Sequence, residues 1–419
     1  MDDPLMLARL QFALTAGSHF LFVALTLGLA TLVALMQTRA TLSGNALHAR
    51  MTRFWGQLYV INYAVGIVTG LVMEFQFGMN WGGMSSLVGQ VFGVPLAMET
   101  VVAFFVESTF LGLWIFGWDR LNRWVHLGLI WVVTLTAYLS AYFILVANGW
   151  MQRPVGYEMR DGVAHLTDLG ALLTNPTAVL AFLHVGFGGL LTAGLFMAGV
   201  SGYHLFRRTA EVEFFGRSMR MGLLALVVAV FPVVVFGGMQ FQYVQPTKHR
   251  SSDEAKAAAA DFAARFGPGD YLPPGLASAA EGVMAMVWSL LFLLAIVALV
   301  KAAFGGWLVR GRIFHVVVMA AVPLPYVAML SGWVFREVGR QPWAVYGVLR
   351  TEDALSGVGP GLITASFVVF TGLFAVLVAV NAWLLARFAR RGPEGARLGA
   401  APPPDEASGA SAAALTPTF

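Results

Sequence analysis

The sequence predicts an all-α integral membrane protein that crosses the bilayer nine times. Hydrophobic residues make up 58% of the 419 residues, charged residues only 11%, and the mean hydropathy is +0.73. A chain this apolar has more hydrophobic surface than a water-soluble core can enclose. Nine apolar stretches reach the roughly 20 residues that a membrane helix needs. The predicted spans cover residues 10–37, 53–78, 93–116, 124–148, 178–204, 217–243, 280–303, 313–334 and 361–388.

The first stretch is expected to remain in the protein as a span. Asp2, Asp3 and Arg9 precede it, and it lacks the short apolar core and small-residue cleavage site of a signal peptide. The distribution of Lys and Arg predicts the orientation. With the N-terminus outside, most of the 26 basic residues lie in inner segments, as the positive-inside rule requires. The net charge of +4 reflects this topology and indicates no nucleic-acid partner.

Three segments fall outside the spans. Residues 149–177 and 244–279 are predicted as outer loops, and the second has an Ala-rich, amphipathic middle from Asp253 to Phe266. Residues 391–419 are rich in Ala, Pro, Ser and Gly and are expected to form a disordered cytoplasmic tail. Residues 1–390 are then expected to form one membrane domain.

The chain has no cysteine. This excludes thiolate metal sites, iron–sulfur clusters, disulfides and covalent haem attachment, so any metal is expected to be held by His, Met, Glu or Asp. The sequence also lacks a Gly-rich phosphate loop of the Walker or dinucleotide type, so nucleotide hydrolysis on this chain is not expected.

Three carboxylates follow the third predicted span inward. Glu99 lies near the outer side, Glu107 eight residues deeper, and Asp119 at the inner surface. From Glu99 to Asp119 is about 30 Å of helix, the thickness of the hydrocarbon core. Ionisable groups are costly in a bilayer and usually functional, so this ladder favours proton transfer from the inside. The alternatives are hydrogen bonding between helices by protonated Glu and, for Asp119, an ion pair with Arg120 or Arg123.

Two histidines and a methionine are candidate ligands of a metal or haem. His19 stands alone among apolar residues, where a hydrogen-bonded packing role is the more common one. His184 is followed by glycines that would let a flat macrocycle approach, and Met284 opens the seventh span at similar depth. Histidine with methionine is a known axial pair of haem. These residues, Glu99 and Glu337 all fall in the outer half of their spans, which indicates cofactors near the outer face.

The segment Gly-Trp-Val-Phe-Arg-Glu-Val-Gly-Arg-Gln-Pro-Trp at 332–343 ends the eighth span. Its carboxylate, Glu337, lies between two arginines, so an interfacial ion pair is one explanation. The depth that Glu337 shares with the candidate ligands favours a metal or proton site instead.

Three motifs resemble subunit I of the cytochrome bd family of quinol oxidases. They are Glu-Phe-Gln-Phe-Gly-Met-Asn-Trp (74–81), the stretch from Pro-Leu-Ala-Met-Glu to Glu-Ser-Thr-Phe-Leu-Gly-Leu-Trp (95–114), and residues 332–343. The resemblance runs from Gln11 to about residue 388. It implies two four-helix bundles plus one peripheral helix, three haems near the outer face, and a quinol-binding loop after the sixth span.

The resemblance also implies which residues hold the haems. His184 and Met284 would be the axial ligands of a low-spin haem b. His19 and Glu337 would bind the two active-site haems, one of b type and one of d type, in an order that stays open. Glu99 would lie beside the haem d iron.

Further residues take roles by the same resemblance. Glu107, with Ser140 nearby, would belong to a proton route from the cytoplasm. Trp333 would sit between haems, and Arg340 would contact haem propionates.

The residues implied for the quinol site are Gln245, Lys248 and Asp253. Asp253 stands where the family has Glu, and Gly282 stands where the family usually has Arg, so Met286 remains an alternative to Met284 as ligand. Because these departures lie on the electron-entry side, a different electron donor or another quinol site stays open.

The sequence therefore predicts a terminal oxidase subunit in the bacterial cytoplasmic membrane, with its N-terminus outside and its C-terminus in the cytoplasm. It would oxidise a quinol, reduce dioxygen to water with cytoplasmic protons, and so generate a membrane potential. Expected cofactors are two haems b and one haem d, or a further haem b in place of haem d. Expected partners are a second large membrane subunit and a small single-span subunit. The alternatives are a haem protein for electron transfer or sensing without oxygen reduction, and an ion or solute transporter.

Overall fold

The computed structural model describes residues 3–303 and 310–399, and this part of the chain contains nine helical segments long and apolar enough to cross a membrane. Each overlaps one predicted span, so the prediction of nine spans is confirmed. The observed helices extend past the apolar stretches because backbone hydrogen bonding continues through the polar residues that flank them. The segments are Pro4–Ser43, Ala46–Met79, Gly82–Phe116, Arg123–Gln152, Leu169–Phe206, Val212–Tyr243, Leu276–Lys301, Arg312–Val338 and Pro360–Arg391.

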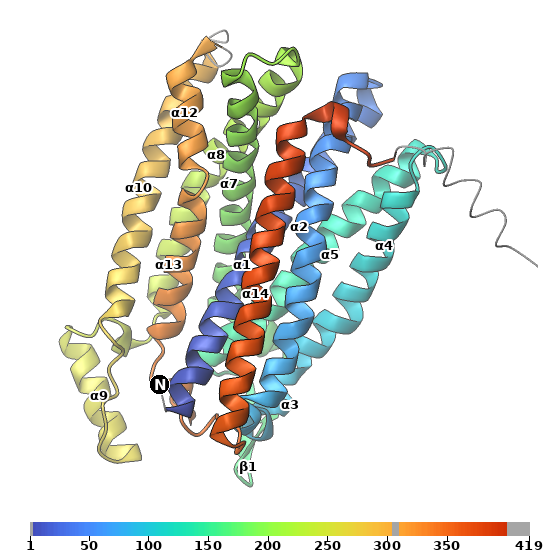
Figure 1. The fold of residues 1–419 in the computed structure, drawn as a ribbon. Coiled ribbons are helices and arrows are strands. Elements are labelled where there is room, and N and C mark those ends of the chain that lie inside the picture. Colours follow the sequence, from blue (N-terminus) through green and yellow to red (C-terminus); the bar gives the residue numbers. More distant parts are fainter. Residues whose placement is uncertain (1–2, 304–309, 400–419) are drawn as a thin grey trace, which may run out of the picture.

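The spans form two groups that meet along α1 and α7 (Figure 1). In the first group, α1 packs on α2 and α5, and α4 packs on α5. In the second group, α7 packs on α8 and α12, while α10 packs on α8 and α13; α14 lies against α1 and α2. This is the expected pair of four-helix bundles with one further helix. The bounds are α1 Pro4–Ser43, α2 Ala46–Met79, α3 Gly82–Met98, α4 Phe105–Phe116, α5 Arg123–Gln152, α7 Pro176–Phe206, α8 Val212–Gln240, α10 Leu276–Ala303, α12 Arg312–Ala321, α13 Leu324–Val338 and α14 Pro360–Arg391.

The two segments predicted as outer loops lie at the same end of the molecule as the N-terminus (Figure 1). Segment 244–279 contains α9, whose bounds Asp253–Phe266 match the predicted amphipathic stretch. Segment 149–177 contains an antiparallel hairpin, which the sequence did not indicate. Its strands are β1 Tyr157–Arg160 and β2 Val163–Leu166, and the short helix α6 Leu169–Leu173 follows; a second hairpin, β3 Trp343–Val345 and β4 Leu349–Arg350, follows α13.

The predicted tail begins where α14 ends, at Arg391, and a short 3-10 turn follows at Pro393–Gly395. Residues 400–419 of that predicted tail lie outside the described residues.

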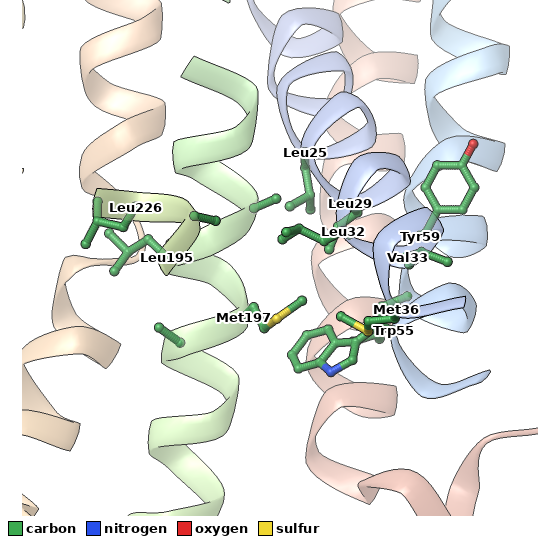
Figure 2. Packing of buried hydrophobic residues seen from close by; sticks show 14 of the residues in the cluster. Leu25, Leu29, Leu32, Val33, Met36, Trp55, Tyr59, Leu195, Met197 and Leu226 are labelled. Carbon is green, nitrogen blue, oxygen red and sulfur yellow. The ribbon is translucent and has the colours of Figure 1, made fainter. Parts of the chain in front are cut away.

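The largest buried cluster lies between α1, α2, α7 and α8, and Figure 2 shows part of it. Glycines bring α7 close to its neighbours on both sides. A Cβ on Gly194 of α7 would lie 2.6 Å from the carbonyl oxygen of Gly222 on α8, and a Cβ on Gly28 of α1 would overlap the carbonyl oxygen of Gly189 on α7. Small residues at such crossings let helix backbones approach in a membrane, where packing contributes more than the hydrophobic effect.

We expect Gly28→Ala to destabilise the protein because its methyl group would force α1 away from α7. Overpacking of this kind costs roughly 1–3 kcal/mol. Thermal unfolding of the purified protein in detergent measures the effect. Gly112→Ala is the matched control, since a Cβ there meets no described atom within 4 Å. Equal melting temperatures for the two variants would contradict the importance of this crossing.

Candidate functional site

A cavity of about 990 Å³ lies in the half of the protein nearest α9 and the N-terminus. Its wall is mostly apolar and comes from both helix groups and from the segment after α8. Of the site residues that the sequence singled out, all except Asp253, Asp119 and the alternative ligand Met286 line this one cavity. They are His19, Glu99, Glu107, Ser140, His184, Gln245, Lys248, Met284, Trp333, Glu337 and Arg340.

His184 and Met284 reach the cavity from α7 and α10. His184 Nδ1 lies 2.8 Å from the carbonyl oxygen of Val233 and donates to it, which leaves the lone pair on Nε2. Each side chain packs against a glycine of a neighbouring helix. A Cβ on Gly237 would lie 2.9 Å from His184 Cε1, and a Cβ on Gly332 would lie 2.8 Å from Met284 Sδ. Any larger residue at these two positions would displace the candidate ligands.

His19 has a similar environment on α1. Its Nδ1 lies 2.9 Å from Thr69 Oγ1, and that hydroxyl donates its hydrogen to the carbonyl oxygen of Val65 or Gly66. Thr69 therefore accepts from Nδ1–H, and Nε2 of His19 keeps its lone pair. A Cβ on Gly70 would lie 3.2 Å from His19 Cε1, so a glycine of α2 again makes room for the ring.

Met284 and Met286, the two methionines that the sequence left as alternatives, differ in environment. Met284 lines the cavity, whereas the Met286 side chain points outward and is 58% exposed. Gly282, which stands where the family usually has Arg, has no described atom within 4 Å of an added Cβ.

Glu337 forms the ion pair that the sequence analysis considered the weaker explanation. Its Oε2 accepts from Arg340 Nη2 at 2.7 Å, and its Oε1 accepts from Asn148 Nδ2 at 2.8 Å. Both side chains of the pair are buried, with 12% and 7% exposed. Each carboxylate oxygen has two lone pairs, so these bonds leave Glu337 able to bind a metal. Arg340 Nη1 is buried without a partner among the described residues, which leaves a donor for an anionic group.

Arg336 is a site residue that the sequence analysis missed. It lines the same cavity and donates to Asn148 Oδ1 at 2.6 Å, Gln240 Oε1 at 3.1 Å and the carbonyl oxygen of Thr177 at 3.3 Å. The hydrogen-bond acceptors of this buried arginine are all neutral, so its positive charge is not neutralised by a directly bonded carboxylate. The sequence feature that could have identified Arg336 is its position in the segment 332–343, three residues after Trp333.

Lys248 and Gln245 fold inward from the segment after α8 and meet Gln152 of α5. Lys248 Nζ donates to Gln152 Oε1 at 3.2 Å, and Gln245 Nε2 donates to the Gln152 carbonyl oxygen at 2.6 Å. Burial, assisted by the positive charge of Arg336, lowers the pKa of Lys248 to about 7. Lys248 therefore faces the cavity as a donor that loses its charge easily.

Asp253 is separated from the other two residues of the implied quinol site. It lies in the first turn of α9, which Ser252 caps, and its exposed carboxylate pairs with Lys256 at 3.1 Å. An acidic residue at a helix N-terminus stabilises the helix dipole, which accounts for its place on the solvent side. Asp253 therefore does not line the cavity that Lys248 and Gln245 face, and a quinol site shared by all three stays a prediction.

The carboxylates on the third span differ in their partners. Pro95 and a π-helical turn, Glu99–Phe104, interrupt this span and place Glu99 and Thr100 on the cavity wall. Ser140 Oγ donates to Glu99 Oε1 at 2.6 Å, and Ser140 and Glu107 line the same cavity. Thr100 Oγ1 lies 2.9 Å from Glu74 Oε1 and 3.3 Å from Glu99 Oε2, so one hydroxyl connects two carboxylates. Glu74 was quoted only as part of a motif and was missed as a site residue.

Asp119 pairs with neither of the arginines considered for it. It lies in the turn after α4, and its exposed carboxylate is 3.4 Å from Arg53 of α2. The sequence neighbours Arg120 and Arg123 were the wrong choice because the turn directs the carboxylate toward a different helix.

The fold and the cavity define a polytopic membrane protein in which imidazole, thioether and carboxylate side chains, the types that ligate haem iron in proteins, line one cavity. The chain belongs to the cytochrome bd terminal oxidase subunit I family, whose model matches residues 7–265 and 253–393.

Two relatives and one solved structure agree with this membership. Cytochrome bd ubiquinol oxidase subunit 1 of Bacillus subtilis (strain 168) is 37% identical, over 93% of this chain and 94% of the relative. Cytochrome bd-II ubiquinol oxidase subunit 1 of Escherichia coli (strain K12) is 32% identical, over 94% of this chain and 98% of the relative. The bd oxidase structure from Geobacillus thermodenitrificans matches with a TM-score of 0.83 at 25% identity, over 94% of this chain and 100% of the matched chain.

The chain is therefore a subunit of a bacterial terminal quinol oxidase, a haem family whose complexes contain a second subunit. Of the three functions that the sequence left open, family membership supports the oxidase, not the electron-transfer or sensing protein or the transporter.

We expect Arg340→Met to destabilise the protein strongly because it leaves the buried Glu337 carboxylate without its cation. Removing one partner of a buried pair costs roughly 3–5 kcal/mol. Glu352→Gln is the control, since it breaks the exposed Arg350–Glu352 pair, a kind of pair that is worth about 1 kcal/mol or less. Thermal unfolding measures both variants, and similar melting temperatures would contradict the prediction.

Proposed function

We propose that this subunit holds two haems b and one haem d in the cavity, or a further haem b in place of haem d, and couples quinol oxidation to the reduction of dioxygen to water. The observation that carries the proposal is that His19, His184 and Met284 all line one cavity and each packs against a glycine of a neighbouring helix. When bound, the haems supply electron transfer from quinol to dioxygen. The protein supplies the ligands, the proton route and a cavity with mostly apolar walls.

His184 and Met284 would hold the low-spin haem b. The Val233 carbonyl oxygen fixes the His184 ring with Nε2 as the ligand atom, as outer partners of metal-binding histidines commonly do. His19, oriented by Thr69, and Glu337 would each hold one of the two active-site haems. Glu99 would stand beside the haem d iron.

The cations around Glu337 would receive the haem propionates. Arg340 has an unpaired buried donor, and Arg336 adds a second positive charge in the same wall. Charge-assisted bonds from arginine to carboxylate are strong and geometrically specific. Trp333, in the same wall, would lie between haems.

Quinol would bind beside the segment 244–279, with Lys248 and Gln245 as hydrogen-bonding residues. Both already reach the cavity, and a lysine with a pKa of about 7 can donate to a quinol oxygen or accept its proton. Asp253 is left out of this contact because it faces solvent.

Protons would come from the cytoplasm through Glu107 and reach the cavity near Glu99 and Ser140. This direction assumes the N-terminus outside and the C-terminus inside, which the Lys and Arg distribution favours. Taking protons from the inner side while quinol releases them outside would generate a membrane potential. A second large subunit and a small single-span subunit would complete the complex.

A reduced-minus-oxidised spectrum of the purified complex, recorded with quinol-driven oxygen uptake, tests the proposal. We expect b-type bands together with a red-shifted d-type band, and oxygen uptake that depends on quinol. A spectrum with b-type bands alone would show that a further haem b replaces haem d. Haem bands without oxygen uptake would contradict the proposed function.

We expect Met284→Leu to remove the low-spin haem signal, because leucine keeps the volume of the side chain but has no thioether to bind iron. Met286→Leu, on the exposed side of the same helix, is the matched control and should leave the spectrum unchanged. Loss of the low-spin signal in Met286→Leu, with a normal spectrum for Met284→Leu, would reverse the assignment.

A further inference from the structure

Two buried tyrosines of α2 lie between the cavity and the inner side of the protein. Tyr59 and Tyr63 are four residues apart, so they lie on one face of the helix about 6 Å apart along its axis, and their rings are 5.7 Å apart. Tyr63 lines the cavity together with Glu107. Tyr59 is one turn nearer the end of α2 that begins at Ala46, the inner end under the proposed orientation.

The hydroxyls of both tyrosines are close to the Glu107 region of α4. A side chain of α4 reaches α2 next to this region, since a Cβ on Gly56 would lie 2.8 Å from the Trp114 ring. Glu107 interacts electrostatically with both tyrosine hydroxyls, and Ser108 is close to that of Tyr63. Figure 2 shows the Tyr59 hydroxyl directed away from the aliphatic side chains labelled around it.

Four buried oxygen atoms in this region form no well-aligned hydrogen bond to a described residue, although Tyr63 Oη lies near both Glu107 and Ser108. They are Tyr59 Oη, Tyr63 Oη, Glu107 Oε1 and Ser108 Oγ. By contrast, the side chain of Asn62, on another face of the same turn, is hydrogen-bonded to described residues. Its amide nitrogen donates to the Phe22 carbonyl oxygen at 2.8 Å and to Thr26 at 2.9 Å, and its oxygen accepts from Asn381.

A buried hydroxyl without a partner costs free energy, and phenylalanine would fill the same space without that cost. Buried polar groups in proteins are almost always hydrogen-bonded, and ordered water bonds those that no protein group reaches. A cluster of two phenols, a carboxyl oxygen and a serine hydroxyl offers enough donors and acceptors to bind such water.

We infer that Tyr59 and Tyr63 are positioning residues that hold ordered water against Glu107 and extend the proton route from this carboxylate toward the inner surface. The inference rests on the proposed role of Glu107 in carrying protons. Each phenol accepts one proton from the inner side as it passes its own proton on, so neither tyrosine is changed after a transfer. No electron moves in this step.

The test uses the complete oxidase complex reconstituted in proteoliposomes, with Tyr59→Phe, Tyr63→Phe and the double variant. Each substitution removes only the hydroxyl and keeps the ring. We expect turnover to fall roughly tenfold for Tyr63→Phe, about the effect of losing one hydrogen bond from the rate-limiting step. The solvent deuterium isotope effect on oxygen uptake should rise, and the haem spectrum should stay unchanged.

Tyr138→Phe is the matched control, because its partly buried hydroxyl bonds to Thr31 Oγ1 at 3.0 Å. It should keep wild-type turnover and isotope effect. If Tyr59→Phe and Tyr63→Phe behave like Tyr138→Phe and raise the melting temperature, the hydroxyls are merely buried and the inference is wrong.

Glu107→Gln separates this inference from the proposed function on which it rests. Full turnover and a normal membrane potential in Glu107→Gln would contradict the proton route itself. If Glu107→Gln loses turnover and the tyrosine variants keep it, the route stands and only the role of the tyrosines is overturned.

Discussion

Glycine at helix crossings is the constraint on which both halves of this protein depend. Where a glycine faces the backbone of another helix, as at Gly28 and Gly194, the two helix backbones come into contact and a packed core forms. Where a glycine faces a side chain, as Gly70 faces His19 and Gly237 faces His184, the same small residue leaves room for an imidazole. One residue type thus brings helices into contact at these crossings and leaves room for imidazole rings beside the cavity.

The polar groups of the cavity follow from the cost of burial in a membrane. Most of them have partners that also orient them. Val233 and Thr69 set the ring orientation of two histidines, Asn148 connects Glu337 to Arg336, and Ser140 holds Glu99. The groups without partners are therefore informative, because an unsatisfied buried donor or acceptor needs an explanation. Arg340 Nη1 faces the proposed propionate site, and the α2 tyrosines face Glu107.

The charge balance of the cavity favours anionic groups near Glu337. Lys248, Arg336 and Arg340 gather around Glu337, and Glu281 is the other carboxylate among the nearby charges. Positive charge at this depth is costly when it is not compensated. Haem propionates are the compensation that the proposed function supplies. Burial, together with the positive charge of Arg336 and Arg340, lowers the pKa of Lys248.

The sequence by itself determined the membrane class, the nine spans, the α9 helix and the common depth of the candidate ligands, because hydropathy and helical rise are local properties. Only the tertiary structure decided which of these residues meet. It placed Asp253 outside the cavity that Lys248 lines, paired Ser140 with Glu99 and Asp119 with Arg53, and distinguished Met284 from Met286. These outcomes depend on how each helix is rotated about its axis and which helix it faces. That rotation is set by packing between residues far apart in the chain, such as the glycine crossings, and no local pattern contains it.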